Sequence, residues 1–274
     1  MVPVAIDLHT HTTASDGTLT PRELVTLAMS KGFRVLSITD HDTVAGFMEA
    51  RGCGGKTLEI VPGIELNAER GSEEIHVLGY YIDVENPVLL KRLGKLREER
   101  ITRVHEIVKR LAALGMKVTF DEIIKYARGE SVGRPHVARL LIDKGYIPDM
   151  QYAFDHFLKH GGKAYVPRPH FPPEEAVEII AASGGIPVLA HPGYNADERI
   201  IDSLVERGLK GIEVFYPDHL PLQREHFSKL AGKKGLLITG GSDFHGFGNS
   251  HFSSLGVEGL SMKHFELLKA ARGK

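Results

Sequence analysis

The stretch DLHTHTTASDG, residues 7–17, places two histidines and two carboxylates within ten positions near the start of the chain. The apolar residues just before it indicate a first β-strand. Because side chains two apart project to the same face of a strand, His9 and His11 can bind one metal ion together. Asp7 shares that face and is expected to orient an imidazole. The stretch is therefore interpreted as part of a metal site rather than as a polar turn.

The composition of the chain excludes several other kinds of site. Its 274 residues are 42% hydrophobic, enough for one large α/β domain or a domain with an insertion. Lys and Arg number 34 against 35 Asp and Glu, which gives no electrostatic reason to expect a dedicated nucleic-acid or membrane-surface protein. Cys53 is the single cysteine, so neither an internal disulfide nor a thiolate-rich metal site is expected. No run reaches the roughly 18 apolar residues of a membrane span, and the default expectation is a cytoplasmic protein.

Short apolar runs alternate with helical patterns through most of the chain. Residues 20–32 illustrate a helix, with Thr20 as N-cap, Glu23 three residues later and Gly32 as its end. This alternation predicts βαβ units around a parallel sheet, open or closed. The expected strands are VAIDLH, VLSITD, LEIVPGIEL, EEIHVLGYYID, IPVLAH, GIEVF and LLITGGSD, and further helices are expected at 43–50, 173–183, 197–207 and 220–234.

Residues 87–160 interrupt the alternation, because successive helical patterns occur there without a convincing strand. We expect an all-helical insertion, followed by the proline-rich return YVPRPHFPP. The predicted organisation is an α/β domain formed by 1–86 and 164–274, with an insertion domain at 87–163.

Residue types that bind metals recur where the expected strands end. Active sites of parallel α/β folds lie at this end of the strands, so these residues are expected to meet. Imidazoles and carboxylates without thiolates suit Zn, Mn or Fe. The residues are His9, His11, Asp40, His41, Glu65, His191, Asp243 and His245, with His76 inside the next expected strand after Glu65.

Each of these residues also has a purely structural interpretation. A lone histidine at a strand end is more often hydrogen-bonded or on the surface, Asp42 or Thr43 can cap the following helix, and His76 alone fits a core histidine. Glu213, in GIEVF, fits either a group behind the metal ligands or a structural residue. The coincidence of so many candidates in one sheet favours the metal site.

Six motifs in order along the chain resemble those of the PHP family, named for polymerase and histidinol phosphatase. They are DLHTHTTASDG, ITDHD, PGIE, HVLGY, LAHPG and GSDFH, and they run from about residue 5 to residue 250. The resemblance implies a distorted TIM-like (β/α)7 barrel, the PHP fold, with three divalent metal ions in its mouth.

The family pattern also implies ligands for the three ions. One ion would be bound by His9, His11, Glu65 and Asp243, a second by Asp16, His41 and His245, and a third by Glu65, His76 and His191, with Glu65 bridging two ions. Asp16 stands where some relatives have histidine, which bears on metal preference.

The insertion resembles that of the stand-alone branch of the family, through REERITR and GRPHVARLL. This branch contains phosphatases of AMP and of 3′,5′-nucleotide bisphosphates and a 5′-to-3′ exoribonuclease. It implies a small phosphorylated substrate, a nucleotide or a short 5′-phosphorylated RNA. Arginine can bind two phosphate oxygens at once, so Arg100, Arg103 and Arg134 are candidate substrate contacts, together with His136. Arg100 and Arg103 fit solvated helix-face charges equally well.

The predicted activity is hydrolysis of nucleotide phosphate monoesters. Divalent ions lower the pKa of bound water to about 7, so a metal-bound hydroxide is the expected nucleophile. A metal or a site histidine, such as His191 or His245, is expected to assist the leaving alkoxide. Two alternatives stay open, a histidinol-phosphate phosphatase and a non-catalytic metal-binding or regulatory module. A metal-dependent amidohydrolase is disfavoured because the sequence offers no candidate carboxylated lysine. The sequence makes no prediction of oligomeric state.

Overall fold

The computed structural model describes residues 5–71, 73–127, 129–193, 197–246, 254–257 and 259–273. Seven strands form one sheet whose spatial order follows the sequence, unlike a doubly wound sheet, whose strand order reverses at a crossover. The strands are β1 (Ala5–Asp7), β2 (Phe33–Ile38), β3 (Glu59–Arg70), β4 (Glu73–Tyr80), β5 (Ile186–Leu189), β6 (Gly211–Phe215) and β7 (Leu237–Gly240).

The two edges of the sheet meet just beyond β1 and β7. Thr10 forms a parallel bridge with Phe244, and the backbone N–H of His11 donates to the carbonyl of Phe244 at 2.9 Å. The backbone N–H of Leu8 also donates to the carbonyl of Gly240 at 3.3 Å. The sheet therefore closes at the carboxyl ends of its outer strands, and the expected α/β barrel is confirmed.

Strand β4 departs from the expected parallel sheet, because it runs antiparallel to both β3 and β5. The chain reverses between Arg70 and Glu73, which leaves no room for the crossover of a dozen or more residues that a parallel pair requires. The remaining neighbouring strands run parallel to each other, namely β1 with β2, β2 with β3, β5 with β6 and β6 with β7. The distortion of the barrel thus lies at β4.

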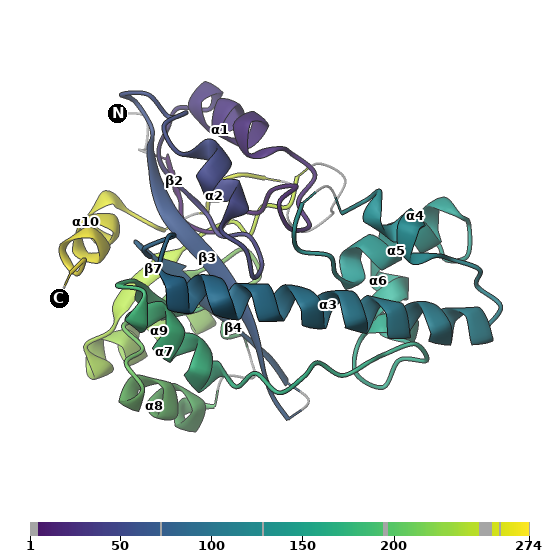
Figure 1. Cartoon of the computed structure of the whole chain (residues 1–274). Coiled ribbons are helices and arrows are strands. Elements are labelled where there is room, and N and C mark those ends of the chain that lie inside the picture. Colours follow the sequence, from purple (N-terminus) through teal and green to yellow (C-terminus); the bar gives the residue numbers. More distant parts are fainter. Residues whose placement is uncertain are drawn as a thin grey trace.

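Helices cover the outside of the barrel (Figure 1). They are α1 (Pro21–Ser30) and α2 (Ala45–Ala50) against β2, α7 (Pro173–Ala182) against β3 to β5, α8 (Glu198–Glu206) against α7, α9 (Pro221–Lys234) against β6 and α10 (Met262–Ala270) against β7. The predicted capping box of α1 is present, since the Thr20 hydroxyl accepts from the N–H of Glu23 and the Glu23 carboxylate accepts from the N–H of Thr20. Helix α10 was not among the predicted elements. None of the helices in the described ranges is both long and apolar enough to cross a membrane.

Every regular element that the structure describes between β4 and α7 is a helix, and turns or loops connect these helices. The helices are α3 (Pro87–Ala113), α4 (Phe120–Ile124), α5 (Arg134–Asp143), α6 (Met150–Ala153) and the π-helix η1 (Phe154–Leu158). Helix α3 extends away from the barrel (Figure 1). Leu89 and Leu93 pack into the barrel core, whereas Val104 and Ile107 pack into a separate core of the insertion. Helix α3 is thus shared by the two cores, and the boundary at residue 87 stays a prediction.

Candidate active site

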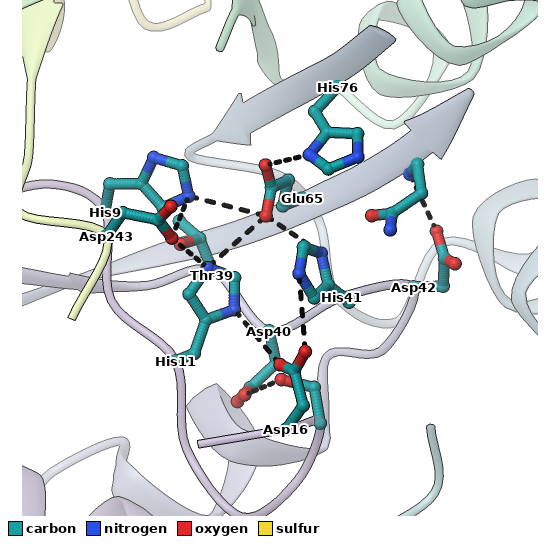
Figure 2. A network of polar contacts seen from close by, with 12 residues as sticks. His9, His11, Asp16, Thr39, Asp40, His41, Asp42, Glu65, His76 and Asp243 are labelled. Atoms are coloured by element: carbon teal, nitrogen blue, oxygen red, sulfur yellow. Dashed lines mark hydrogen bonds and ion pairs between the residues drawn. The ribbon is translucent and has the colours of Figure 1, made fainter. Parts of the chain in front are cut away.

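The carboxyl ends of the strands bring the predicted metal-binding residues together. Figure 2 shows how His9, His11, Asp16, His41, Glu65, His76 and Asp243 face a common centre. Glu65 and His76 belong to β3 and β4, His9 and His11 follow β1, His41 follows β2, His191 follows β5, and Asp243 and His245 follow β7. Because β3 and β4 pair Asn67 with His76, the His76 ring lies diagonally across from Glu65 on the same face.

Glu65 is the central carboxylate of this cluster and is fully buried. Its Oε2 lies 2.8 Å from Nδ1 of His41, 3.3 Å from Nε2 of His11 and 3.4 Å from Nε2 of His9. Its Oε1 lies 2.9 Å from Nδ1 of His76 and 3.1 Å from Nε2 of His191. A carboxylate surrounded by imidazoles on both oxygens has the arrangement of a bridging ligand.

Among the residues that the structure describes, three groups of donor atoms are compact enough to hold a metal ion, with all donors in each group within 4.8 Å of one another. The groups are His9, His11, Glu65 and Asp243, then His11, Asp16, His41 and His245, and then His41, Glu65 and His76. The first equals the predicted set. The second adds His11 to the predicted set, and the third contains His41 where the prediction has His191.

The donor atoms are also suited to a cation because several of them have no hydrogen-bond partner. Several are buried and make no hydrogen bond of normal geometry, although they face one another: His9 Nε2, His11 Nε2, His41 Nδ1, His76 Nε2, Asp16 Oδ1, Glu65 Oε2 and Asp243 Oδ1. A buried polar atom without a partner costs about 1–3 kcal/mol. A cluster of them is therefore costly for the protein alone, and divalent cations would satisfy them together. The residues present fit such a group.

Burial and neighbouring charges set the protonation of the donors. Burial lowers the pKa of His11 to about 3, helped by the positive neighbours His245 and His41, so its imidazole is neutral and ready to bind a cation. Burial alone would also lower the pKa of His245, but Asp16 and Asp243 outweigh it and raise the value to about 9. Burial opposes ionisation of Asp16, yet His41 and His245 hold its pKa well below the usual range.

Two of the donors occupy an unusual backbone conformation. Asp243 has φ of 53° and His191 has φ of 22°, in the left-handed region that non-glycine residues seldom adopt. Such strain is retained where the surroundings over-determine it, and it is concentrated at functional sites. Here it turns two donors inward immediately after β7 and β5.

Glu213, which sequence reasoning left open, is a buried link between donors. Its Oε1 lies 3.0 Å from Nδ1 of His9, and its Oε2 accepts the backbone N–H of His191 at 2.9 Å. Contact at Nδ1 leaves the Nε2 of His9 facing Glu65 and Asp243. Glu213 therefore orients the His9 ring, the function that was expected of Asp7.

The expectation for Asp7 is wrong. Its carboxylate accepts the backbone N–H groups of His9 at 3.2 Å, Ser242 at 2.9 Å and Gly256 at 2.7 Å, and also the Ser242 hydroxyl. Strand β1 ends at Asp7, so the regular alternation that would have aimed it at an imidazole does not continue to His11. Asp7 instead ties the first motif to the last by backbone contacts.

The loop of residues 12–17 is fixed by Asp40 of the barrel on one side and by the insertion on the other. Asp40 accepts the N–H of Thr12 at 2.7 Å and the Ser15 hydroxyl at 2.6 Å. From the insertion, Arg139 donates to the carbonyl of Asp16 at 2.5 Å. A Cβ at Gly129 would lie 2.3 Å from Cα of Ala14, so only glycine allows this approach of the insertion to the loop. The insertion thus packs directly over Asp16.

A cavity of about 180 Å³ separates the donor cluster from the insertion. Asp16, His41 and His76 line it from the barrel, and Val104, Ile107, Val132, Pro135 and Phe154 form an apolar wall on the insertion. Four arginines also line it: Arg100, Arg103, Arg134 and Arg168. Sequence reasoning missed Arg168, which lies in the proline-rich return, and only its place in that unusual segment could have pointed to it.

The four arginines differ in how well their charges are compensated. Arg100 donates to Asp42 at 2.8 and 2.5 Å, and Arg134 contacts Glu74 at 2.5 Å. Arg168 donates to the backbone carbonyl of Asn67 at 2.8 Å and lies 3.6 Å from Asp42.

Arg103 has the least compensated charge of the four. It donates from Nε to the carbonyl of Val166 at 2.7 Å, while its buried Nη2 has no hydrogen-bond partner. Burial, reinforced by repulsion from Arg134 and Arg168, lowers its pKa to about 9. An anion in the cavity would relieve this repulsion.

His136, the fourth predicted substrate contact, is buried and is not among the residues that line the cavity. Its Nδ1 accepts the backbone N–H of Gly133 at 3.0 Å, at the start of α5. This contact holds the first turn of the helix that carries Arg134. A direct contact of His136 with substrate stays a prediction.

Residues 7–164 match the model of the PHP domain. The chain belongs to the PHP family. Two curated relatives cover nearly the whole of this PHP protein. The 5′-3′ exoribonuclease Rnm of Escherichia coli is 35% identical over 94% of this chain and 92% of its own length. The 3′,5′-nucleoside bisphosphate phosphatase of Chromobacterium violaceum is 34% identical over 88% of this chain and 87% of its own length.

Solved structures support the same family at the level of the fold. A protein of Bifidobacterium adolescentis, whose assignment as a metal-dependent phosphoesterase is itself a prediction, aligns with a TM-score of 0.89 and 30% identity over 97% of this chain and 96% of its own. A Chromobacterium violaceum structure named as an amidohydrolase aligns with a TM-score of 0.88 and 31% identity over 99% of both chains. The PHP protein is a metal-dependent hydrolase that acts on phosphoester bonds.

Proposed function

We propose that this protein removes phosphate from nucleotides, with nucleoside 3′,5′-bisphosphates as the first class of substrate, then AMP, and that it also accepts short 5′-phosphorylated RNA. The observation that supports the proposal is the shared cavity, which is lined both by the metal-donor residues Asp16, His41 and His76 and by four arginines. A substrate with two separated phosphates can place one phosphate at the donor residues and the other at the arginines. The two curated relatives act, by name, on a nucleoside bisphosphate and on RNA.

The donor cluster would hold three divalent ions, with Mn, Zn or Fe suited to its imidazole and carboxylate donors. When bound, such ions activate water and neutralise charge on phosphoryl oxygens. Glu65 is the proposed bridging ligand. The proposed ligands are the nine predicted residues, His9, His11, Asp16, His41, Glu65, His76, His191, Asp243 and His245.

The protein's own groups position the substrate and supply a proton. Arg103 binds the phosphate that is not cleaved, through its unpartnered Nη2, while Arg100, Arg134 and Arg168 complete the set of cavity arginines. His191 is the proposed donor to the leaving alkoxide, because its side chain is 23% exposed and is the most accessible of the nine. In the absence of metal, burial opposes a charged His191, but Glu65 outweighs it and raises the pKa of His191. His245, 12% exposed, is the second candidate for this role.

The alternatives fit the cavity less well. The substrate of a histidinol-phosphate phosphatase carries one phosphate and a cationic amine, so it does not require four arginines in the cavity. A regulatory module has no need of a substrate cavity beside a complete donor set. For amidohydrolase chemistry with a carboxylated lysine, no lysine is buried among the described residues.

A panel of substrates tests the proposal. Phosphate release would be measured with Mn²⁺ on adenosine 3′,5′-bisphosphate, AMP, a 5′-phosphorylated trinucleotide and histidinol phosphate. The highest kcat/KM is expected for the bisphosphate. A preference for histidinol phosphate, or no phosphate release from any of them, would refute the proposal.

A further inference from the structure

A second cavity, of about 410 Å³, lies next to the first and has no part in the proposed chemistry. It opens between the end of the β3–β4 hairpin and the return segment that follows the insertion. Its lining residues are Glu69, Gly71, His160, Tyr165, Pro167, Arg168 and His170. The backbone N–H of Glu69 donates to the carbonyl of Phe171 at 2.9 Å, which fixes the hairpin against the return segment.

The two cavities meet at a pair of arginines. Arg168 lines both of them. Arg103 lines the first cavity, and its guanidinium carbon lies 5.6 Å above the ring of Tyr165, which lines the second. Arg168 therefore lies at the boundary between the two cavities, and the contact between Arg103 and Tyr165 joins their linings.

We propose that the second cavity binds the neighbouring nucleotide of an oligonucleotide whose terminal nucleotide occupies the first cavity. This inference rests on the proposed function, because it assumes a nucleotide in the first cavity. Arg168, at the junction, would face the phosphate that links the two nucleotides.

The side chains of the second cavity suit a nucleobase better than a further phosphate. Tyr165 offers a partly buried aromatic ring, and the ring of His160 meets it edge-on with centroids 5.4 Å apart. Bases stack on such rings with little dependence on sequence. Glu69 contributes a carboxylate 3.9 Å from Arg168, and its buried Oε1 has no hydrogen-bond partner. That oxygen would accept a hydrogen bond from the exocyclic amino group of a base.

The test compares long and short substrates on variants of Tyr165. Phosphate release from a 5′-phosphorylated trinucleotide and from adenosine 3′,5′-bisphosphate would be measured for wild type, Tyr165→Ala and Tyr165→Phe. Loss of one stacking contact is expected to lower kcat/KM for the trinucleotide about 5- to 150-fold in Tyr165→Ala. The bisphosphate should change less than twofold, and Tyr165→Phe should retain both activities because stacking does not need the hydroxyl. Tyr152→Ala, an exposed tyrosine on α6 outside both cavities, is the matched control.

The outcomes separate this inference from the proposed function. An equal loss on both substrates would mean that Tyr165 serves the first nucleotide or supports Arg103, and would overturn the inference. A trinucleotide rate in Tyr165→Ala equal to that of wild type would also overturn the inference. So would a wild-type protein that hydrolyses the bisphosphate but does not hydrolyse the trinucleotide and is not inhibited by it. A folded, metal-loaded wild type that hydrolyses neither substrate refutes the proposed function itself.

Discussion

Glu213 and His9 form a buried pair in which the carboxylate Oε1 lies 3.0 Å from the imidazole Nδ1. The same carboxylate accepts the backbone N–H of His191, so it links donors that follow β1 and β5. A carboxylate at Nδ1 fixes the tautomer in which Nε2 carries the lone pair, and it raises the basicity of the ring. The affinity of the cluster for metal therefore depends on a residue that is not itself a proposed ligand.

Replacing Glu213 by Gln keeps the shape of the side chain but removes the charge that orients His9. We expect metal affinity to fall about 10- to 100-fold while the fold is retained. The measurement is metal content after dialysis against a graded series of chelator concentrations. Glu225→Gln is the control, because Glu225 is exposed and pairs with Lys229 on the surface of α9. Equal metal retention in wild type and Glu213→Gln would contradict the role of Glu213.

Asp42 neutralises two arginines of the cavity and should be important for stability. It is buried, accepts two hydrogen bonds from Arg100 and one from the N–H of Asn67, and lies 3.6 Å from Arg168. Asp42→Asn leaves like charges facing each other, so the free energy of unfolding should fall by roughly 3–5 kcal/mol. Urea denaturation measures this. Glu178→Gln, which breaks an exposed pair with Arg207, should cost less than about 1 kcal/mol. A comparably small loss for Asp42→Asn would show that this buried pair is not stabilising.

Arg103 should govern substrate affinity, because it lines the cavity and its buried Nη2 has no hydrogen-bond partner. A charge-assisted hydrogen bond contributes about 1.5–3 kcal/mol, so Arg103→Ala should raise KM for adenosine 3′,5′-bisphosphate by about 10- to 150-fold. Because the metal donors are untouched, kcat should fall much less. Steady-state kinetics provide both constants, with Arg207→Ala on the exposed surface of the barrel as control. If KM stays constant in Arg103→Ala, Arg103 does not bind the substrate.

The ion pair of Glu74 with Arg134 gives stability a defined pH dependence. Burial would raise the pKa of Glu74, but Arg134 outweighs it and lowers the value to about 2 from the usual 4.5. A carboxyl whose folded pKa is depressed contributes stability above its unfolded pKa, and loses that contribution as pH falls toward the folded value. The urea midpoint should therefore drop between pH 6.5 and pH 4 by more in wild type than in Glu74→Gln, both measured in chelator. Identical drops would show that the pair carries no such linkage.

The sequence predicted the elements whose signals are local. Thr20 and Glu23 mark the start of α1 by their own spacing. The donors at strand ends converge because the barrel gathers the carboxyl ends of its parallel strands in one place. The direction of β4 depends on the short connection between Arg70 and Glu73, which the expectation of βαβ units did not take into account.

Other features depend on contacts between distant segments and had no local signal. Glu213 meets His9 across 204 residues of sequence. Arg168 lines the cavity only because the return segment folds back on β3. There the Arg168 side chain donates to the backbone carbonyl of Asn67. Asp7 was assigned the wrong partner because β1 ends sooner than the apolar pattern suggested. In each case the residue type was visible in the sequence, but its partner was fixed by tertiary structure.

The central claim is that the donor cluster around Glu65 would hold the divalent ions on which hydrolysis of a nucleotide phosphate depends. The most direct measurement is phosphate release from adenosine 3′,5′-bisphosphate, with metal content determined on the same samples of wild type, Asp243→Ala and the exposed control Glu225→Gln. Chelator-treated wild type should be inactive and should recover in proportion to the Mn²⁺ that it rebinds, while Asp243→Ala should stay folded, bind less metal and remain inactive. Full turnover by metal-free wild type, or by Asp243→Ala, would contradict the account.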